Sequence, residues 1–338
     1  QLDLPPGMHA AVGWSRDILR SNQAAGTVYA LPAHAMALHA RVAFGRFTEK
    51  RVQVAGGDLV YATLDAPHRA TDAGIARWLT VGMGAVAQLF GKPPVSRTHL
   101  ILQPHVSGRG RPIVYGRATL SGGPMIHVML SGTTTDAEMP GEWITIHEML
   151  HLGMPTTNLE DRWFGEGFVS YYQEVVRARA GILTPQQAWQ NLHSWMERGR
   201  KSGGKATLAE ESRLMNNRYA YHRVYWGGAA LALKLDARIR RATDGRRSLD
   251  DVMRHLHDRF ITPGTPIPAL DLMRHADAFL GVDFCERMAR DALRSRSFPD
   301  LRQVYAGFGL RVARGRVTLV GGAPLTHHRD AIMRPGGK

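Results

Sequence analysis

The feature that most constrains this chain is the segment 147–151, which has the sequence HEMLH. Residues four apart lie on one face of an α-helix, about one turn from each other, so His147 and His151 can bind one metal ion together. Glu148 is offset around the helix and can act as a general base on a water molecule at the metal. No Gly or Pro interrupts residues 142–152, which favours the helix that this geometry requires. The segment therefore predicts two metal ligands and a catalytic base on one helix.

A third metal ligand is expected at Glu166, within the segment 163–168 (WFGEGF). A catalytic zinc site usually has three protein ligands and one open position. The connection 152–165 is long enough for a second helix to return antiparallel to the first and present Glu166 to the two histidines. Taken alone, the first motif also fits two histidines and a glutamate on a solvated helix face. The two motifs together favour a Zn2+ site made by His147, His151 and Glu166.

These residues resemble the gluzincin metallopeptidases, in particular the alanyl/leucyl aminopeptidase and glycyl aminopeptidase families. In those families the third ligand stands in W-x-x-E-G-[FL]-[AT]-x-Y, and residues 163–171 are close to this pattern, after a linker that is shorter here. The segment 225–231 (YWGGAAL) resembles their Y-x-K-G-A-x motif, with Gly227 in place of the lysine. The resemblance covers about 142–256 and implies that Tyr225 donates a hydrogen bond to the oxyanion. Without the neighbouring motifs, Tyr225 would be interpreted as a core aromatic residue of a long apolar helix.

Two positions depart from these families. Their members bind a free N-terminus through a carboxylate, often in G-x-M-E-N upstream of the zinc helix. The nearest stretch, 122–127 (GGPMIH), places the apolar Ile126 where the glutamate would stand, which favours an endopeptidase or a very selective enzyme. The strand 125–130 is then a candidate edge strand for pairing with an extended peptide. Gln173 replaces a glutamate that is common in relatives, and carboxylates behind ligand histidines orient them, so the strength of the metal site stays open.

The resemblance implies an α+β fold with a thermolysin-like zincin catalytic domain, in which a small sheet is followed by a mostly helical lobe. We expect three parts: an N-terminal β-rich part over 1–68, the catalytic domain over 69–256, and a C-terminal helical and β extension over 257–338. Hydrophobic periodicity and turn residues predict the elements. Expected helices lie at about 71–90, 141–152, 165–180, 184–198 and 219–241, with another capped by Ser248 and Asp251. Expected strands lie at 42–44, 52–54, 59–61, 99–102, 113–120, 125–130 and 310–320.

The net charge of +14 and a pI of about 10.4 make nucleic acid or an anionic envelope surface conceivable partners. The basic residues are scattered along the chain, however, which favours an arginine-rich solvated surface over a nucleic-acid binder. The resemblance to the peptidases implies a peptide or protein substrate. Many of them fall within expected helices: Arg177, Arg179, Arg238, Arg240 and Arg241. Two rival functions stay open, a non-catalytic basic envelope- or nucleic-acid-binding protein with a retained zinc fold, and a zinc hydrolase of non-peptide bonds. The single cysteine, Cys285, excludes an internal disulfide or a cysteine-based zinc site.

The sequence starts at Gln1 without a targeting segment, and we expect an exported protein, periplasmic or secreted, from which a signal peptide has been removed. A trimmed chain and a cytoplasmic location remain open, as does the oligomeric state. No apolar run without charges reaches the roughly 18 residues that cross a bilayer, so no transmembrane segment is expected. The most apolar stretch, 75–90, is interrupted by Arg77 and several glycines and is interpreted as a buried or amphipathic helix.

Overall fold

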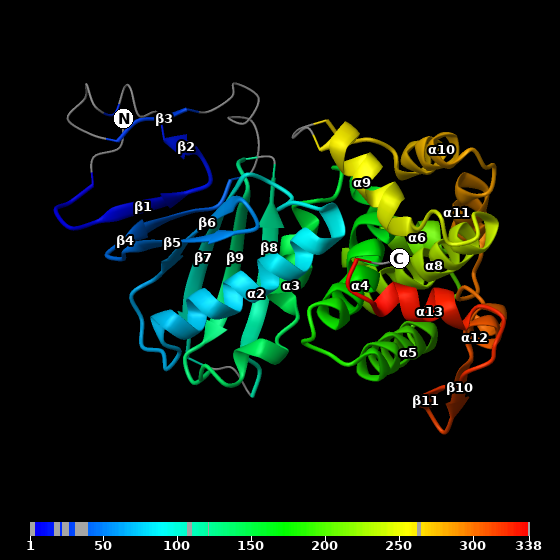
Figure 1. The fold of residues 1–338 in the computed structure, drawn as a ribbon. Helices are drawn as coiled ribbons and strands as arrows, with labels where there is room; N and C mark the ends of the chain where they lie inside the picture. The colour runs from blue at the N-terminus through cyan, green and yellow to red at the C-terminus, as the bar shows by residue number, and fades with distance from the viewer. Residues whose placement is uncertain are drawn as a thin grey trace. The chain divides into compact units, whose positions relative to one another are not determined.

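The computed structural model describes the chain in segments: residues 4–16, 21, 27–30, 40–106, 110–120, 122–261 and 265–336. The chain forms two compact units, each described here by itself (Figure 1). Unit 1 comprises residues 1–87 and 92–153, and unit 2 comprises 88–91 and 154–338. The boundaries expected from sequence, at 68 and 256, do not coincide with this division, and the three-part organisation stays a prediction.

Unit 1 is built on a five-stranded mixed sheet with the strand order β5-β6-β7-β9-β8 (Figure 1). The hairpin of β5 (Glu49–Val54) and β6 (Gly57–Thr63) is antiparallel, and β7 (Arg97–His105) pairs parallel to β6. β9 (Met125–Ser131) pairs parallel to β7, and β8 (Ile113–Thr119) returns antiparallel to β9 at the edge. The expected α+β fold with a small sheet is confirmed. The sheet also includes two strands that sequence reasoning placed in a separate N-terminal part.

The expectation that residues 125–130 form an edge strand is wrong. β9 lies between β7 and β8, so of this hairpin it is β8 that lies at an edge of the sheet, and β5 forms the opposite edge. The Gly-rich connection after β8 lets the two strands pair antiparallel, and either could have been the outer one from pattern alone. The parallel pairing of β7 with β9 decides the order. A parallel partner lies far along the sequence, so this pairing leaves no local signal from which the order could be predicted.

One helix among the described residues, α2 (Asp72–Phe90), is long and apolar enough to cross a membrane by length and composition, and 61% of that window is buried inside the structure. It packs as a core helix of unit 1. A Cβ atom at Gly82 would lie 3.4 Å from Ile146 Cγ1 and from Met149 Sδ, and one at Gly84 would lie 3.8 Å from Val54 Cγ1. These contacts place α2 against β5 and against the helix that carries the HEMLH segment.

Unit 1 also contains two small two-stranded sheets. β1 (His9–Val12) pairs with β4 (Val42–Gly45), and β2 (Ser15–Arg16) pairs with β3 (Tyr29–Ala30). An apolar cluster joins the first of these sheets to the main one through Ala11, Phe47, Ala62, Ile101 and Met125.

Unit 2 is mostly helical, as expected (Figure 1). A 3-10 turn, Leu159–Asp161, leads into α4 (Arg162–Arg179), α5 (Pro185–Lys201), α6 (Leu208–Arg213), α7 (Met215–Arg218) and α8 (Tyr221–Ala242). The later elements are α9 (Leu249–Phe260), α10 (Ala269–Leu280), α11 (Cys285–Arg294), α12 (Arg302–Phe308), the hairpin β10 (Leu310–Ala313) with β11 (Arg316–Leu319), and α13 (Thr326–Met333). The capping box of Ser248 and Asp251 at the start of α9 was expected from sequence and is present.

Buried ion pairs connect the helices of unit 2 and correct the interpretation as a solvated surface for Arg177, Arg179 and Arg240, whereas Arg238 and Arg241 are exposed as expected. Arg240 Nε donates to Asp236 Oδ1 at 2.9 Å, and both residues are almost fully buried. Asp236 also accepts hydrogen bonds from the Tyr171 hydroxyl (2.8 Å) and from the backbone N–H of Leu249 (3.0 Å), so one carboxylate joins α4, α8 and the start of α9. A buried charge needs such partners.

Arg177 and Arg179 are likewise buried and paired, with Glu174 (3.1 Å) and Asp250 (2.8 Å) respectively. These arginines therefore have a structural role inside unit 2 and are not available to an external partner.

Candidate metal centre

The HEMLH segment lies on α3 (Ile144–His151), as expected. A carboxylate starts this helix: Glu142, which is 5% exposed, accepts hydrogen bonds from the backbone N–H groups of Ile144 and Thr145. These are among the N–H groups that a helix leaves without an internal partner at its first turn, and a negative charge there also favours the helix dipole. Glu142 thereby fixes the first turn of α3 just before His147.

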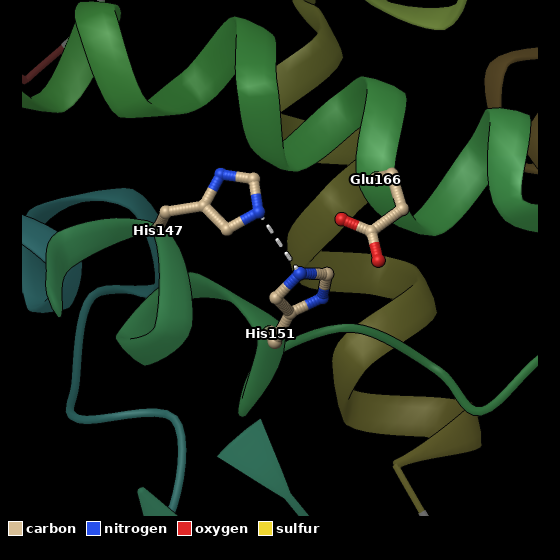
Figure 2. Close-up of side chains that lie close together, drawn as sticks. All are labelled: His147, His151 and Glu166. Carbon is tan, nitrogen blue, oxygen red and sulfur yellow. Dashed lines mark hydrogen bonds between the residues drawn. The ribbon is translucent and has the colours of Figure 1, made fainter. Parts of the chain in front are cut away.

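The two histidines of α3 point toward one another (Figure 2). The Nε2 atoms of His147 and His151 are 3.2 Å apart. Two nitrogens bound at about 2.0–2.1 Å to one tetrahedral zinc ion would be about 3.3 Å apart, so this separation fits two ligands of a single ion. His147 is buried, and the indole of Trp143, one turn before it, meets its ring edge-on at 5.9 Å.

Glu166 lies in the first turns of α4 and completes the set. One ligand atom each of His147, His151 and Glu166 lies within 4.8 Å of the others. Figure 2 shows the carboxylate of Glu166 directed to the imidazoles. Two imidazoles and one carboxylate are the donors that a catalytic zinc ion takes, and the fourth position is left for water or substrate. The predicted ligand set is thus brought together, and no second group of this kind is found in the described ranges.

Two glycines determine where α4 crosses α8. A Cβ atom at Gly228 would lie 2.0 Å from the carbonyl oxygen of Trp163 and 2.8 Å from the Cα of Gly167. The two helix backbones therefore touch at Gly167 and Gly228, and only a residue without a side chain fits. Glu166 precedes the first of these glycines and Tyr225 lies three residues before the second. Both functional candidates of unit 2 thus stand within a turn of the crossing.

Tyr225 is half-buried on α8, and its catalytic role stays a prediction. The structure gives a physical reason for the nearby departure from the family motif. A Cβ atom at Gly227 would lie 3.2 Å from Leu208 Cδ1 and 3.3 Å from Arg223 Nη1. Arg223 is 1% exposed, so a lysine at position 227 would have to start beside a buried guanidinium. A glycine avoids this crowding.

A strand of the sheet holds Glu148 in place through a backbone hydrogen bond. The backbone N–H of Ala118, on the edge strand β8, donates to Glu148 Oε2 at 2.7 Å. Gly116, two residues earlier on β8, faces the same carboxylate, because a Cβ atom there would lie 2.8 Å from Glu148 Cγ and 2.5 Å from Ile144 Cγ2. Sequence reasoning missed this support. The only signal was an isolated glycine within a strand pattern, which often marks a close backbone approach.

The position matched to the family's amine-binding glutamate is not a surface position. Ile126 lies on the inner strand β9 and is fully buried, opposite Ala118 in the register of β8. The edge strand itself reads IVYGRAT and contains no carboxylate. The absence of an amine anchor on this edge therefore does not depend on how the motif is aligned.

The carboxylate next to Gln173 is used inside unit 2. Glu174 accepts hydrogen bonds from Arg177 Nη1 (3.1 Å), Asn191 Nδ2 (2.9 Å) and the Gln173 amide (3.0 Å). Gln173 and Glu174 are each 1% exposed. Glu174 is thus committed to its own helix pair and does not replace the glutamate that relatives carry at position 173. The effect of Gln173 on the metal site stays a prediction.

The chain thus has a mixed sheet that leads into an HExxH helix, followed by a helical unit whose first helix supplies a glutamate. A model of the M61 glycyl aminopeptidase family matches residues 154–227, a range that contains Glu166 and Tyr225, in agreement with the resemblance seen in the motifs. The comparison with curated protein sequences found no match.

Solved structures share the fold. An aminopeptidase N family protein from Idiomarina loihiensis superposes with a TM-score of 0.72 at 18% identity, over 91% of this chain and 56% of the other. An M1 zinc metallopeptidase from Deinococcus radiodurans gives 0.59 at 16% identity, over 88% and 63%. Yeast LTA4 hydrolase gives 0.60 at 10% identity, over 87% and 46%. The chain therefore spans less than two thirds of the length of these proteins.

Proposed function

We propose that this chain is a zinc-dependent peptidase in which His147, His151 and Glu166 hold the metal. The observation that carries the proposal is the convergence of the three donor atoms within 4.8 Å on the helices that the motifs specify. Zinc bound there would supply Lewis-acid chemistry, polarising a carbonyl group and lowering the pKa of water. Proton transfer and stabilisation of the developing negative charge depend on the side chains around the metal.

Glu148 is the general base of the proposed reaction. Its carboxylate takes the proton of the attacking water and passes it to the leaving amine as the peptide bond breaks. Because the Ala118 N–H engages Oε2, the second carboxylate oxygen exchanges the proton in this proposal. The Tyr225 hydroxyl donates a hydrogen bond to the carbonyl oxygen as negative charge develops on it, a contribution of about 3–4 kcal/mol in comparable sites.

An extended peptide is the substrate that the site supports best. β8 has no partner strand on one side, so a peptide can add to the sheet there through the backbone groups that Glu148 does not occupy. A mutant of the Deinococcus radiodurans M1 zinc metallopeptidase, which shares the fold with a TM-score of 0.57, has been solved with a Tyr-Ser-Ala substrate. Because β8 offers no carboxylate for a free amino group, we favour cleavage within a peptide, or of a narrow set of N-termini.

The decisive experiment compares hydrolysis of a peptide library by the wild-type chain and by Glu148→Gln. We expect the variant to retain zinc, because Glu148 is not a ligand, and to lose turnover by several orders of magnitude. Peptide cleavage by mass spectrometry and zinc content by elemental analysis are measured on the same samples. Undiminished cleavage by Glu148→Gln would remove Glu148 from the mechanism.

The rival functions predict other outcomes of the same screen. A zinc hydrolase of non-peptide bonds would leave the library intact and cleave ester or amide model compounds in a Glu148-dependent way. A non-catalytic protein with a net charge of +14 would cleave neither and would bind DNA or anionic lipid with a steep salt dependence.

A further inference from the structure

The edge strand β8 makes a contact that its role in the sheet does not require. We propose that β8 positions the catalytic base: the backbone N–H of Ala118 holds one oxygen of the Glu148 carboxylate, and Gly116 provides the space for it. This inference rests on the proposed function of Glu148. It identifies Ala118 and Gly116 as positioning residues that act through Glu148 and do not touch the substrate's reacting atoms.

The Ala118 amide is available because it belongs to the open side of the strand. In an antiparallel pair, alternate residues direct their N–H and C=O groups to the partner strand, and the others point outward. Ala118 stands opposite Ile126 on β9, yet its N–H donates to Glu148 Oε2 at 2.7 Å. At this length the bond is a charge-assisted one to a carboxylate, the stronger kind of hydrogen bond.

Gly116 makes this approach sterically possible. A Cβ atom at position 116 would lie 2.5 Å from Ile144 Cγ2, 2.8 Å from Glu148 Cγ and 3.2 Å from Glu148 Oε1. Both neighbours belong to α3, so any larger residue would push the helix or the carboxylate away from β8. The glycine therefore determines the distance between the strand and the base.

The two oxygens of the Glu148 carboxylate therefore have different surroundings. Oε2 is held by Ala118, whereas Oε1 has no hydrogen-bond partner within the ranges that the structure describes. A carboxylate fixed at one oxygen keeps its orientation and retains the other oxygen for accepting a proton. Loss of the anchoring N–H would let the carboxylate rotate and lower the fraction of time in which it can accept that proton.

The first test uses Ala118→Pro against Ala118→Gly. Proline removes the N–H, and on an edge strand it is tolerated where the N–H points outward, whereas glycine keeps the N–H. We expect kcat to fall roughly 10- to 100-fold in Ala118→Pro, the range found when groups that orient active-site residues are removed, with KM and zinc content unchanged. Ala118→Gly should stay within about 2-fold of the wild type. Wild-type kcat in Ala118→Pro would overturn the inference.

A second pair of variants tests the space at Gly116. Gly116→Ala should lower kcat in the same way, without loss of zinc, because the methyl group displaces Glu148. Gly84→Ala, on α2 in the same unit, adds a methyl group at an ordinary contact distance of 3.8 Å and should leave kcat unchanged. Equal activity of the two variants would contradict the role of Gly116.

An activity-independent measurement separates this inference from the proposed function. The Ala118 amide should exchange slowly with solvent in the wild type and in Glu148→Gln, whose side-chain oxygen still accepts the hydrogen bond. It should exchange markedly faster in Glu148→Ala, as followed residue by residue by NMR. If the wild type cleaves no peptide, the proposed function fails while the exchange data still decide the contact. Unchanged protection in Glu148→Ala would overturn the inference even if the chain is an active peptidase.

Discussion

The imidazole of His99 lies within unit 1, on β7, and has no hydrogen-bond partner for either ring nitrogen within the described residues. Burial, with a smaller effect of the nearby Arg97, lowers the pKa of His99 from 6.5 to about 4. The folded state therefore holds this histidine neutral, while the unfolded chain protonates it below its ordinary pKa. The unfolded state binds more protons between these two values, so stability must fall as the pH falls through that window.

We predict that His99 alone accounts for a measurable part of the decrease in the free energy of unfolding at acid pH. The stability that His99 contributes is fully present above about pH 6.5 and is lost as the pH approaches 4. The difference of 2.5 pKa units amounts to at most about 3 kcal/mol. Free energies of unfolding at pH 7.5 and pH 4.5, measured for the wild type and for His99→Leu, should show a smaller loss in the variant. Parallel pH profiles would contradict the assignment.

At the residue scale the metal ligands could be predicted from the sequence, whereas the hydrogen bond that holds Glu148 could not. The spacing of His147 and His151 has a direct geometric consequence on a helix, and the Nε2 separation of 3.2 Å follows from it. The anchor of Glu148 is a backbone amide, which every residue except proline carries. The identity of Ala118 therefore contained no information about the contact, which depends on strand order.

The crossing of α4 and α8 is the element-scale feature that places Glu166 and Tyr225. Its two glycines stand where the helix backbones touch, with only 2.0 Å between a Cβ atom at Gly228 and the Trp163 carbonyl oxygen. Glycine in a helix interior is unfavourable by about 0.5–1 kcal/mol relative to alanine, so its presence at this point indicates a packing requirement.

We predict that Gly228→Ala separates the helices and lowers the free energy of unfolding by about 2 kcal/mol, in the range of other overpacking substitutions. Gly165→Ala is the matched control on α4, since no atom lies within 4 Å of its Cβ position. That variant should be neutral or slightly more stable, because alanine is the better helix former. Chemical denaturation of both variants makes the comparison. Equal stabilities would show that the crossing can widen without cost.

The elements themselves were largely readable from sequence, because their signals are local. Hydrophobic periodicity indicated α2, α3, α4, α5 and α8, and the pair Ser248 and Asp251 indicated the start of α9. The order of β8 and β9 was not readable. It depends on the parallel pairing of β7 with β9, two strands that β8 separates in the sequence.

For the whole molecule, the division into two units falls at residues 153 and 154, directly after the HExxH helix. His147 and His151 precede this point and Glu166 follows it. The sequence predicted a boundary at 68 instead, because it gave no sign that β5 and β6 belong to the main sheet. They join it through the pairing of β6 with β7, and the whole of α2 lies between these two strands in the sequence. The number of arginines was also a poor guide at this scale, because some of them, such as Arg240 paired with Asp236, are buried inside unit 2.

The central claim is that one zinc ion is held by three residues, and metal content tests it most directly. After purification with zinc supplied, elemental analysis should find about one zinc ion per chain in the wild type and in His327→Ala, which alters an exposed histidine far along the sequence. His147→Ala and Glu166→Ala should both lose the metal. A wild-type chain that stays free of zinc, or a Glu166→Ala variant that retains it in full, would contradict the proposed site.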